Sequence, residues 1–255
     1  MENLTALREE INKMADLALS MLKNTFDGFM KHDSDILAGV LKDEERLNDM
    51  ERNLTASLVA ISKGKGADKK NIMLLSNIVE DLEEIGDYIK DMIERIEIKI
   101  EEKLLFSDDA VDEYKHLYNV VETELADVEK ALRMNDNNFA KRVLCGEEDH
   151  VDNLVQKYRE THTQRLVAGI CLPRACNMFL NLLDFTAQIS HHAKAIAKNI
   201  ETLNYLRNGL AHSFFPENLK RSKPEYKGKS IFSKEGLKLF MDDMDEWYTF
   251  FMFKY

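Results

Sequence analysis

Three pairs of oxygen-bearing side chains recur at a spacing of four residues along this chain. The pairs are Glu44 with Asn48, Glu83 with Asp87, and Glu148 with Asp152. On an α-helix, residues four apart lie on one face, about one turn from each other. Two such pairs on facing helices would concentrate ligands for iron, manganese, magnesium or zinc. Acidic residues number 46 of 255, so the same spacing also arises on solvated helix faces, and both interpretations stay open.

Histidine and cysteine are the other candidate ligands. His191 and His192 are adjacent, and adjacent helical residues point about 100° apart, so at most one of them faces a given site. Cys171 and Cys176 are five residues apart, without a second Cys pair or a nearby His at zinc-site spacing, so we expect buried or idle thiols. We expect His162 on the surface or at a helix cap.

Enzymatic motifs give little support for catalysis. The sequence holds no Gly-rich phosphate loop, no GxSxG and no HExxH, so we predict a protein that is not an enzyme. The alternative from another class is a carboxylate-bridged metalloenzyme, which needs a Glu-x-x-His pair on each of two helices. Glu160 precedes His162, and Glu148 precedes His150, by only two residues. A metal-free helical scaffold with solvated acidic faces is the third interpretation.

Composition favours an all-α protein in a reducing compartment. Hydrophobic residues make up 44% and charged residues 32% of the chain, with three Pro and ten Gly. A net charge of −11 argues against nucleic-acid binding, which depends on Lys and Arg. Three Cys make a disulfide framework unexpected. Because no signal peptide or long apolar run is present, we expect a cytoplasmic protein that can dock on a membrane protein.

Apolar residues spaced by three and four predict six long helices. We predict them over residues 3–31, 34–62, 69–104, 108–134, 138–168 and 174–206. Asp33 or Ser34, Asp68, and Ser107 stand where helix N-caps are needed. Short loops between long helices imply antiparallel neighbours, so the chain reads as antiparallel three-helix bundles.

The second three helices repeat the first at an offset of about 104 residues, which indicates a tandem pair of bundles. Glu44 falls on Glu148, and Ile85 falls on Ile189. We place the repeats at residues 1–106 and 107–206. The remaining residues, 207–255, are predicted to form a loop and an aromatic-rich C-terminal helix over about 234–252. Gly86 lies in the middle of the third helix, where it is expected to permit close helix packing.

Several motifs resemble those of PhoU domains. The string Leu82-Glu83-Glu84-Ile85-Gly86-Asp87 is similar to the LERIGD-type signature, and residues 44–51 resemble the acidic motif of the preceding helix. Residues 148–154 resemble the same acidic motif, and residues 189–197 resemble a drifted IGDHAxxIA segment. Residues 158–166 resemble the form found in PhoU-like regions of proteins related to sodium/phosphate cotransporters. The resemblance spans roughly residues 3–206.

The resemblance implies a cytoplasmic regulator of phosphate transport and phosphate homeostasis that acts through protein contacts. Its implied partners are a phosphate transporter or the sensor and regulatory machinery, with a homo-oligomer, a dimer, as the assembly. Members of the family bind iron or zinc clusters through acidic helix motifs. Carried over by position, the first site comprises Glu44, Asn48, Glu83 and Asp87, with the neutral Asn48 as a departure.

The second site departs further from the family pattern. Ala187 stands at the position equivalent to Glu83, and His191 at the position equivalent to Asp87. Glu148, Asp152 and His191 remain as ligands implied by the resemblance, a set that favours zinc, nickel or ferrous iron. We therefore expect the first site to be the better one for hard cations, and the second to be lost or changed.

Overall fold

Long amphipathic helices dominate the computed structural model of the protein, which describes residues 2–64, 68–145, 150–214, 225–226 and 229–230. The chain divides into two compact units, Ile11–Leu203 and a second made of Met1–Glu10 with Asn204–Tyr255. All candidate site residues fall in the range of the first unit. In the second, β1 (Glu225–Tyr226) pairs antiparallel with β2 (Lys229–Ser230).

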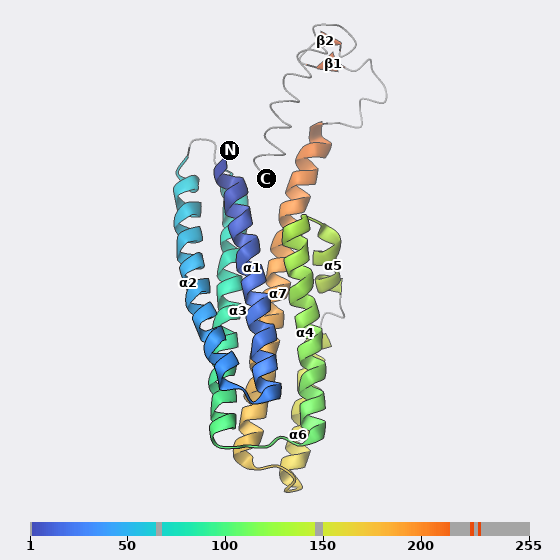
Figure 1. Ribbon diagram of the computed structural model, residues 1–255. Coiled ribbons are helices and arrows are strands. Elements are labelled where there is room, and N and C mark those ends of the chain that lie inside the picture. The colour runs from blue at the N-terminus through green and yellow to red at the C-terminus, as the bar shows by residue number, and fades with distance from the viewer. Residues whose placement is uncertain (1, 65–67, 146–149, 215–224, 227–228, 231–255) are drawn as a thin grey trace. The chain divides into compact units, whose positions relative to one another are not determined.

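The first three helices end and begin where the sequence places polar caps. They are α1 (Glu2–Lys31), α2 (Ser34–Ser62) and α3 (Lys69–Glu101). The Asp33 carboxylate accepts the amides of Asp35 and Ile36 at the start of α2, which satisfies donors that have no partner within the helix. Asp68 caps α3 in the same way. The helices run alternately up and down (Figure 1), as the short predicted loops require.

The second set of helices differs from the prediction at the end of its last helix. It comprises α4 (Asp108–Met134), α5 (Asn137–Cys145), α6 (His150–Val167) and α7 (Pro173–Phe214). The structure describes α5 and α6 within the helix predicted over 138–168, on either side of residues 146–149, which lie outside the described part, so a single helix there stays a prediction. The predicted end of the last helix near 206 is wrong: α7 continues through Gly209, whose cost of about 1 kcal/mol a 42-residue helix tolerates.

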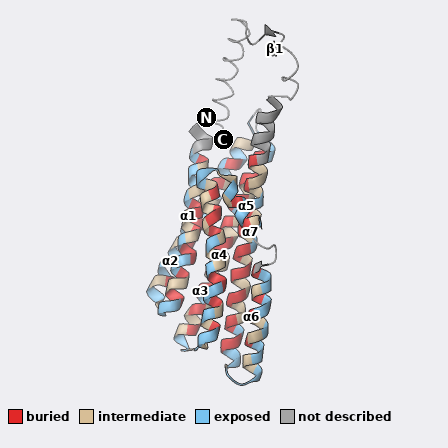
Figure 2. Cartoon of the chain, turned by 90° about the vertical axis from the view of Figure 1, so that its right-hand side faces the viewer, coloured by how far each residue is buried: buried red, intermediate tan, exposed pale blue. Residues whose placement is uncertain are grey.

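Aromatic side chains join the two sets of helices within the Ile11–Leu203 unit. Phe26 of α1 stacks on Tyr118 of α4 with ring centroids 3.8 Å apart, and Phe29 meets the edge of the buried Tyr114 at 5.1 Å. Between α3 and α7, Tyr88 packs near Phe185. Buried residues form stripes along the facing sides of the helices (Figure 2). The six predicted apolar stripes therefore make one continuous core.

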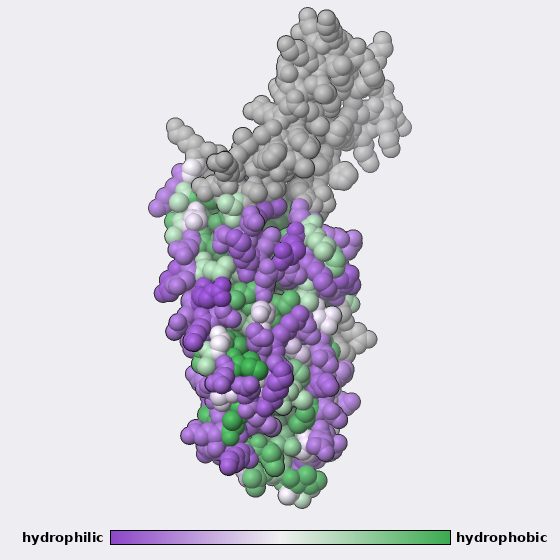
Figure 3. Space-filling view, viewed as in Figure 1, coloured by the Kyte–Doolittle hydropathy of each residue, from purple (hydrophilic) through white to green (hydrophobic). Residues whose placement is uncertain are grey.

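The surface of this unit is mostly polar (Figure 3). Apolar colour gathers at the end where the α3–α4 and α6–α7 turns lie. Leu105, Val167, Ile170 and Leu172 are the large apolar side chains exposed in these turns and at the end of α6. Among the described residues, none of the helices combines the length and apolar character that a membrane span requires.

Two sequence predictions fall on residues that the structure does not describe. The aromatic-rich helix predicted over 234–252 lies outside the described residues, as does Glu148. The structure describes an all-helical Ile11–Leu203 unit, apart from residues 65–67 and 146–149. The repeat boundaries at 106 and 206 stay predictions.

Candidate functional site

The acidic pairs of the first repeat lie on α2 and α3, two helices that approach closely at Gly86. A Cβ atom added at Gly86 would lie 2.3 Å from Cδ2 of Leu47 and 3.8 Å from Cε of Met21. Real Cβ atoms do not come so close, so the missing side chain lets α3 pack against α2. This contact confirms the packing role predicted for Gly86, one turn from Glu83 and next to Asp87.

Glu44 is already bound by a cation from its own chain. Its side chain is 4% exposed, and its Oε1 atom accepts hydrogen bonds from Lys90 Nζ and Asn48 Nδ2, both at 2.9 Å. Burial of a carboxylate is costly unless it is paired, and Lys90 supplies that pairing. The hydrogen bond to Glu44 raises the pKa of Lys90 above its ordinary value. The sequence argument missed Lys90, which lies two turns beyond Glu83.

Asn48 carries the clearest sign of a missing partner on this face. Its Nδ2 group donates to Glu44, whereas its Oδ1 atom is buried and has no hydrogen-bond partner. Buried acceptors without a donor are uncommon and point to a water or an ion. The residue types fit a cation at this place, because Asn48 offers a free oxygen within a group of carboxylates.

Glu83 and Asp87 add negative charge to the same face of α3. Burial and the nearby carboxylates of Asp87, Glu84, Glu51 and Glu44 raise the pKa of Glu83. Burial also raises the pKa of Asp87, and Lys90 opposes that change only in part. When ionised, Glu83 and Asp87 are therefore repelled by the neighbouring carboxylates, and a bound cation would relieve that repulsion.

The candidate residues of the second repeat are only partly brought together. His191 Nε2 lies 3.0 Å from Asp152 Oδ1, and both side chains are exposed. Ala187 is buried and offers no ligand. Asp184, one turn from Ala187, forms an ion pair with Arg159. Among the described residues of the predicted second site, Asp152 and His191 form an acid–histidine pair.

The two adjacent histidines serve different partners, as predicted from their directions. His192 Nδ1 lies 2.9 Å from Asp81 Oδ1 on α3, and its ring packs near Tyr88. His191 faces α6 through Asp152. His192 therefore ties α7 to the first repeat, and only His191 can take part in a second-repeat site.

Donor atoms close enough for one metal ion occur elsewhere. Within the described residues, a single group of three or more His, Cys, Asp or Glu side chains has its ligand atoms within 4.8 Å of one another. That group is His162, Cys171 and Cys176. His162 is fully buried, so its predicted place at the surface or a cap is wrong. No His lies at zinc-site spacing from the two thiols in the sequence, but the α6–α7 turn brings His162 back to them.

The PhoU domain family model matches residues 11–96, which lie within α1–α3. The predicted second repeat, residues 107–206, falls outside that match. No curated protein sequence matches the chain.

Two solved structures share its fold. PhoU from Pseudomonas aeruginosa has a TM-score of 0.72 and 24% identity, and the match covers 82% of this chain and 98% of that one. The phosphate transport system regulatory protein PhoU from Streptococcus pneumoniae has a TM-score of 0.69 and 12% identity, covering 81% and 95%. Residues 11–96 therefore match the PhoU domain family, and the chain has the all-helical fold of the PhoU proteins.

Proposed function

We propose that this chain regulates phosphate transport through contacts with a phosphate transporter or with its sensor machinery. The observation that carries the proposal is the match of residues 11–96 to the PhoU domain family, in a chain whose fold matches PhoU structures over most of their length. One of those structures is described as a phosphate transport system regulatory protein. The proposed role requires binding of a partner and no chemical transformation.

The acidic face of α2 and α3 is the proposed cation-binding part of this regulator. Asn48, Glu83 and Asp87 would hold a divalent ion such as iron, zinc or manganese, with Glu44 joining when Lys90 gives way. The support is the unpartnered Oδ1 atom of Asn48 and the raised pKa of Glu83 and Asp87. A bound ion would supply positive charge that links α2 to α3.

Lys90 gives this face two alternative states. With Lys90 on Glu44, the buried carboxylate is neutralised from within the chain. A divalent ion that recruits Glu44 must displace the ammonium group, so ion binding and the Lys90 contact compete. Lys90 is 42% exposed on its side chain, which leaves it free to move into solvent.

Affinity capture of the tagged full-length chain from its native host tests the partner. Cells are grown with scarce and with abundant phosphate, and bound proteins are identified by mass spectrometry after brief cross-linking. We expect a phosphate-transport component to be enriched under one of the two conditions. Recovery of no such component under either condition would contradict the proposal. A tagged unrelated helical protein of similar charge controls for non-specific capture.

One sequence motif favours the alternative of a carboxylate-bridged metalloenzyme. Glu113 and His116 on α4 stand at the Glu-x-x-His spacing. However, Glu113 binds Arg165 and Thr161, whereas His116 Nδ1 lies 2.6 Å from the Tyr158 hydroxyl. These two side chains serve separate contacts to α6, so the geometry favours a regulator over a di-metal enzyme.

A further inference from the structure

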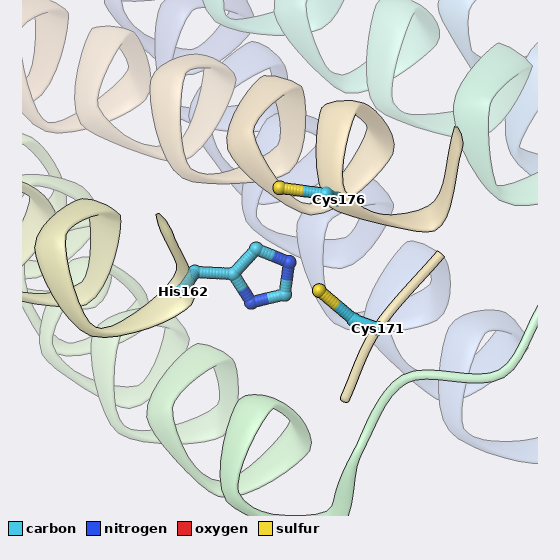
Figure 4. Close-up of side chains that lie close together, drawn as sticks. All are labelled: His162, Cys171 and Cys176. Carbon is cyan, nitrogen blue, oxygen red and sulfur yellow. The ribbon is translucent and has the colours of Figure 1, made fainter. Parts of the chain in front are cut away.

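Three side chains of types that bind metal ions meet where the chain passes from α6 to α7. His162 comes from the last turns of α6, Cys171 from the connecting loop, and Cys176 from the first turn of α7. One ligand atom of each lies within 4.8 Å of the other two. Figure 4 shows the far edge of the imidazole ring directed toward the two sulfur atoms.

The imidazole has a nitrogen without a partner. His162 is 1% exposed, and its Nε2 atom is buried with no hydrogen-bond partner. Leaving a buried polar atom unpaired costs free energy. Burial and the nearby Arg165 lower the pKa of His162, which favours the neutral ring. A neutral imidazole is the form that binds metal ions.

The backbone of the α6–α7 turn places the two thiols. Gly169 has a φ of +71°. The amides of Gly169 and Ile170 donate to the carbonyls of Leu166 and Arg165, a Schellman ending that turns the chain back toward α6. The Cys176 amide donates to the Leu172 carbonyl in the first turn of α7. Cys171 and Cys176 both follow this reversal, which brings them back beside His162 of α6.

Neighbouring side chains hold the ring in place. Phe179 stacks on His162 with centroids 4.1 Å apart and planes 20° apart. Arg165 Nη2 lies 3.3 Å from His162 Nδ1 and also binds Glu113, which accepts from Thr161. Arginine only donates, so the free ring carries its proton on Nε2. The negative charge of Glu113 opposes part of the fall in the pKa of His162.

We propose that His162, Cys171 and Cys176 form a zinc site that fastens the α6–α7 turn, with a water as fourth ligand. Zn²⁺ prefers thiolate and imidazole ligands in a tetrahedral arrangement, whereas magnesium and calcium prefer oxygen. Tetrahedral zinc would bring the donor atoms to roughly 3.5–3.8 Å from each other. The present spacing reaches that with small side-chain movements.

Zinc binding requires the protons on the two sulfur atoms and on Nε2 of His162 to leave those atoms. The two thiols release their protons to solvent, and the imidazole proton moves from Nε2 to Nδ1. Arg165 Nη2, which lies 3.3 Å from Nδ1 in the free site, must move away from that atom. The site is separate from the acidic face of α2 and α3, and it stands independently of the proposed regulatory function.

Zinc and cobalt loading of the full-length chain tests the site. The protein is purified with reductant, stripped with chelator, mixed with one equivalent of Zn²⁺ or Co²⁺ and desalted. Metal content and the thiolate-to-cobalt charge-transfer absorption are then measured. We expect about one bound zinc per chain and the thiolate absorption with cobalt. Wild-type protein that retains no zinc, or cobalt without that absorption, would overturn the proposal.

Cysteine variants localise the signal. Cys171→Ser, in the half-buried loop position, is expected to weaken zinc binding at least tenfold and to reduce the thiolate absorption, because Cys176 remains as a thiolate ligand. Cys145→Ser is the matched control, because Cys145 is exposed and lies on α5. Glu83→Gln/Asp87→Asn should leave the absorption intact. Equal zinc affinity in Cys171→Ser and Cys145→Ser would overturn the assignment, as would a Cys171–Cys176 disulfide in the reduced, metal-loaded wild type.

Discussion

Lys90 Nζ lies 2.9 Å from Oε1 of Glu44, joining α3 to a carboxylate that is almost completely buried in α2. Asn48 donates to the same oxygen atom. The residue at the centre of the predicted first metal site therefore has a cation of its own. A metal ion that uses Glu44 as a ligand must displace the Lys90 ammonium group.

Removing Lys90 should destabilise the fold through the charge it leaves behind. Lys90→Met is expected to lower the free energy of unfolding by about 1–2 kcal/mol, less than for a fully buried pair because the ammonium is partly solvated. Glu44→Gln/Lys90→Met should cost less than the sum of the single variants. Urea unfolding of the four proteins measures the coupling. Strictly additive effects would show that the contact contributes nothing.

Divalent ions should stabilise the protein through the acidic face. At an ion concentration ten times the Kd, we expect Mn²⁺ to add about 1.4 kcal/mol to the free energy of unfolding. Glu83→Gln/Asp87→Asn should abolish that increment, whereas Lys90→Met should reach it at lower concentration. Asp108→Asn/Asp112→Asn is the control, since both residues are exposed at the same spacing on α4. An equal ion effect in all variants would rule out this site.

Gly86→Ala should destabilise the protein despite the better helix propensity of alanine. The added methyl group meets the fully buried Leu47, and overpacking of this kind costs about 1–3 kcal/mol. Gly39→Ala is the matched control on α2, where nothing lies within 4 Å of the new atom, and it should stabilise by up to about 1 kcal/mol. Thermal unfolding compares the two. A stabilised Gly86→Ala protein would contradict the close contact.

Glu83 should make stability depend on pH in the acidic range. Its pKa is raised in the folded protein, so the folded state binds more protons than the unfolded state between the two pKa values. Stability therefore falls as pH rises through this interval. Glu83→Gln should stabilise by about half a kcal/mol at pH 7, and the gain should vanish below about pH 4. Urea unfolding at both pH values checks this, and a gain independent of pH would contradict it.

The starts of α2, α3 and α4 were predictable because local side chains set them. Asp33, Asp68 and Ser107 each accept backbone amides at the helix starts that the sequence indicates. The course of the second half was less predictable. Asn208 and Gly209 follow the predicted helix end near 206, yet α7 runs through them to Phe214. The cost of one or two residues with weak helix propensity is small compared with the stability of a long helix.

The candidate site was predictable only where it follows from position on a helix. Their spacing along α3 predicts that Glu83 and Asp87 share one face of the helix, and a Gly in mid-helix predicts the close packing at Gly86. The contact of Lys90 with Glu44 joins residues 46 apart and depends on the register of two helices. The meeting of His162 with two thiols depends on a chain reversal at Gly169, which no ligand-spacing motif describes.

Phosphate uptake by the native host tests the central claim most directly. Uptake of radiolabelled phosphate is measured in wild-type cells, in cells lacking this chain and in complemented cells, after growth with scarce and with abundant phosphate. The ratio of the two uptake rates is expected to move toward one without the chain and to recover on complementation. A ratio that is the same in all three strains would contradict a role in regulating phosphate transport.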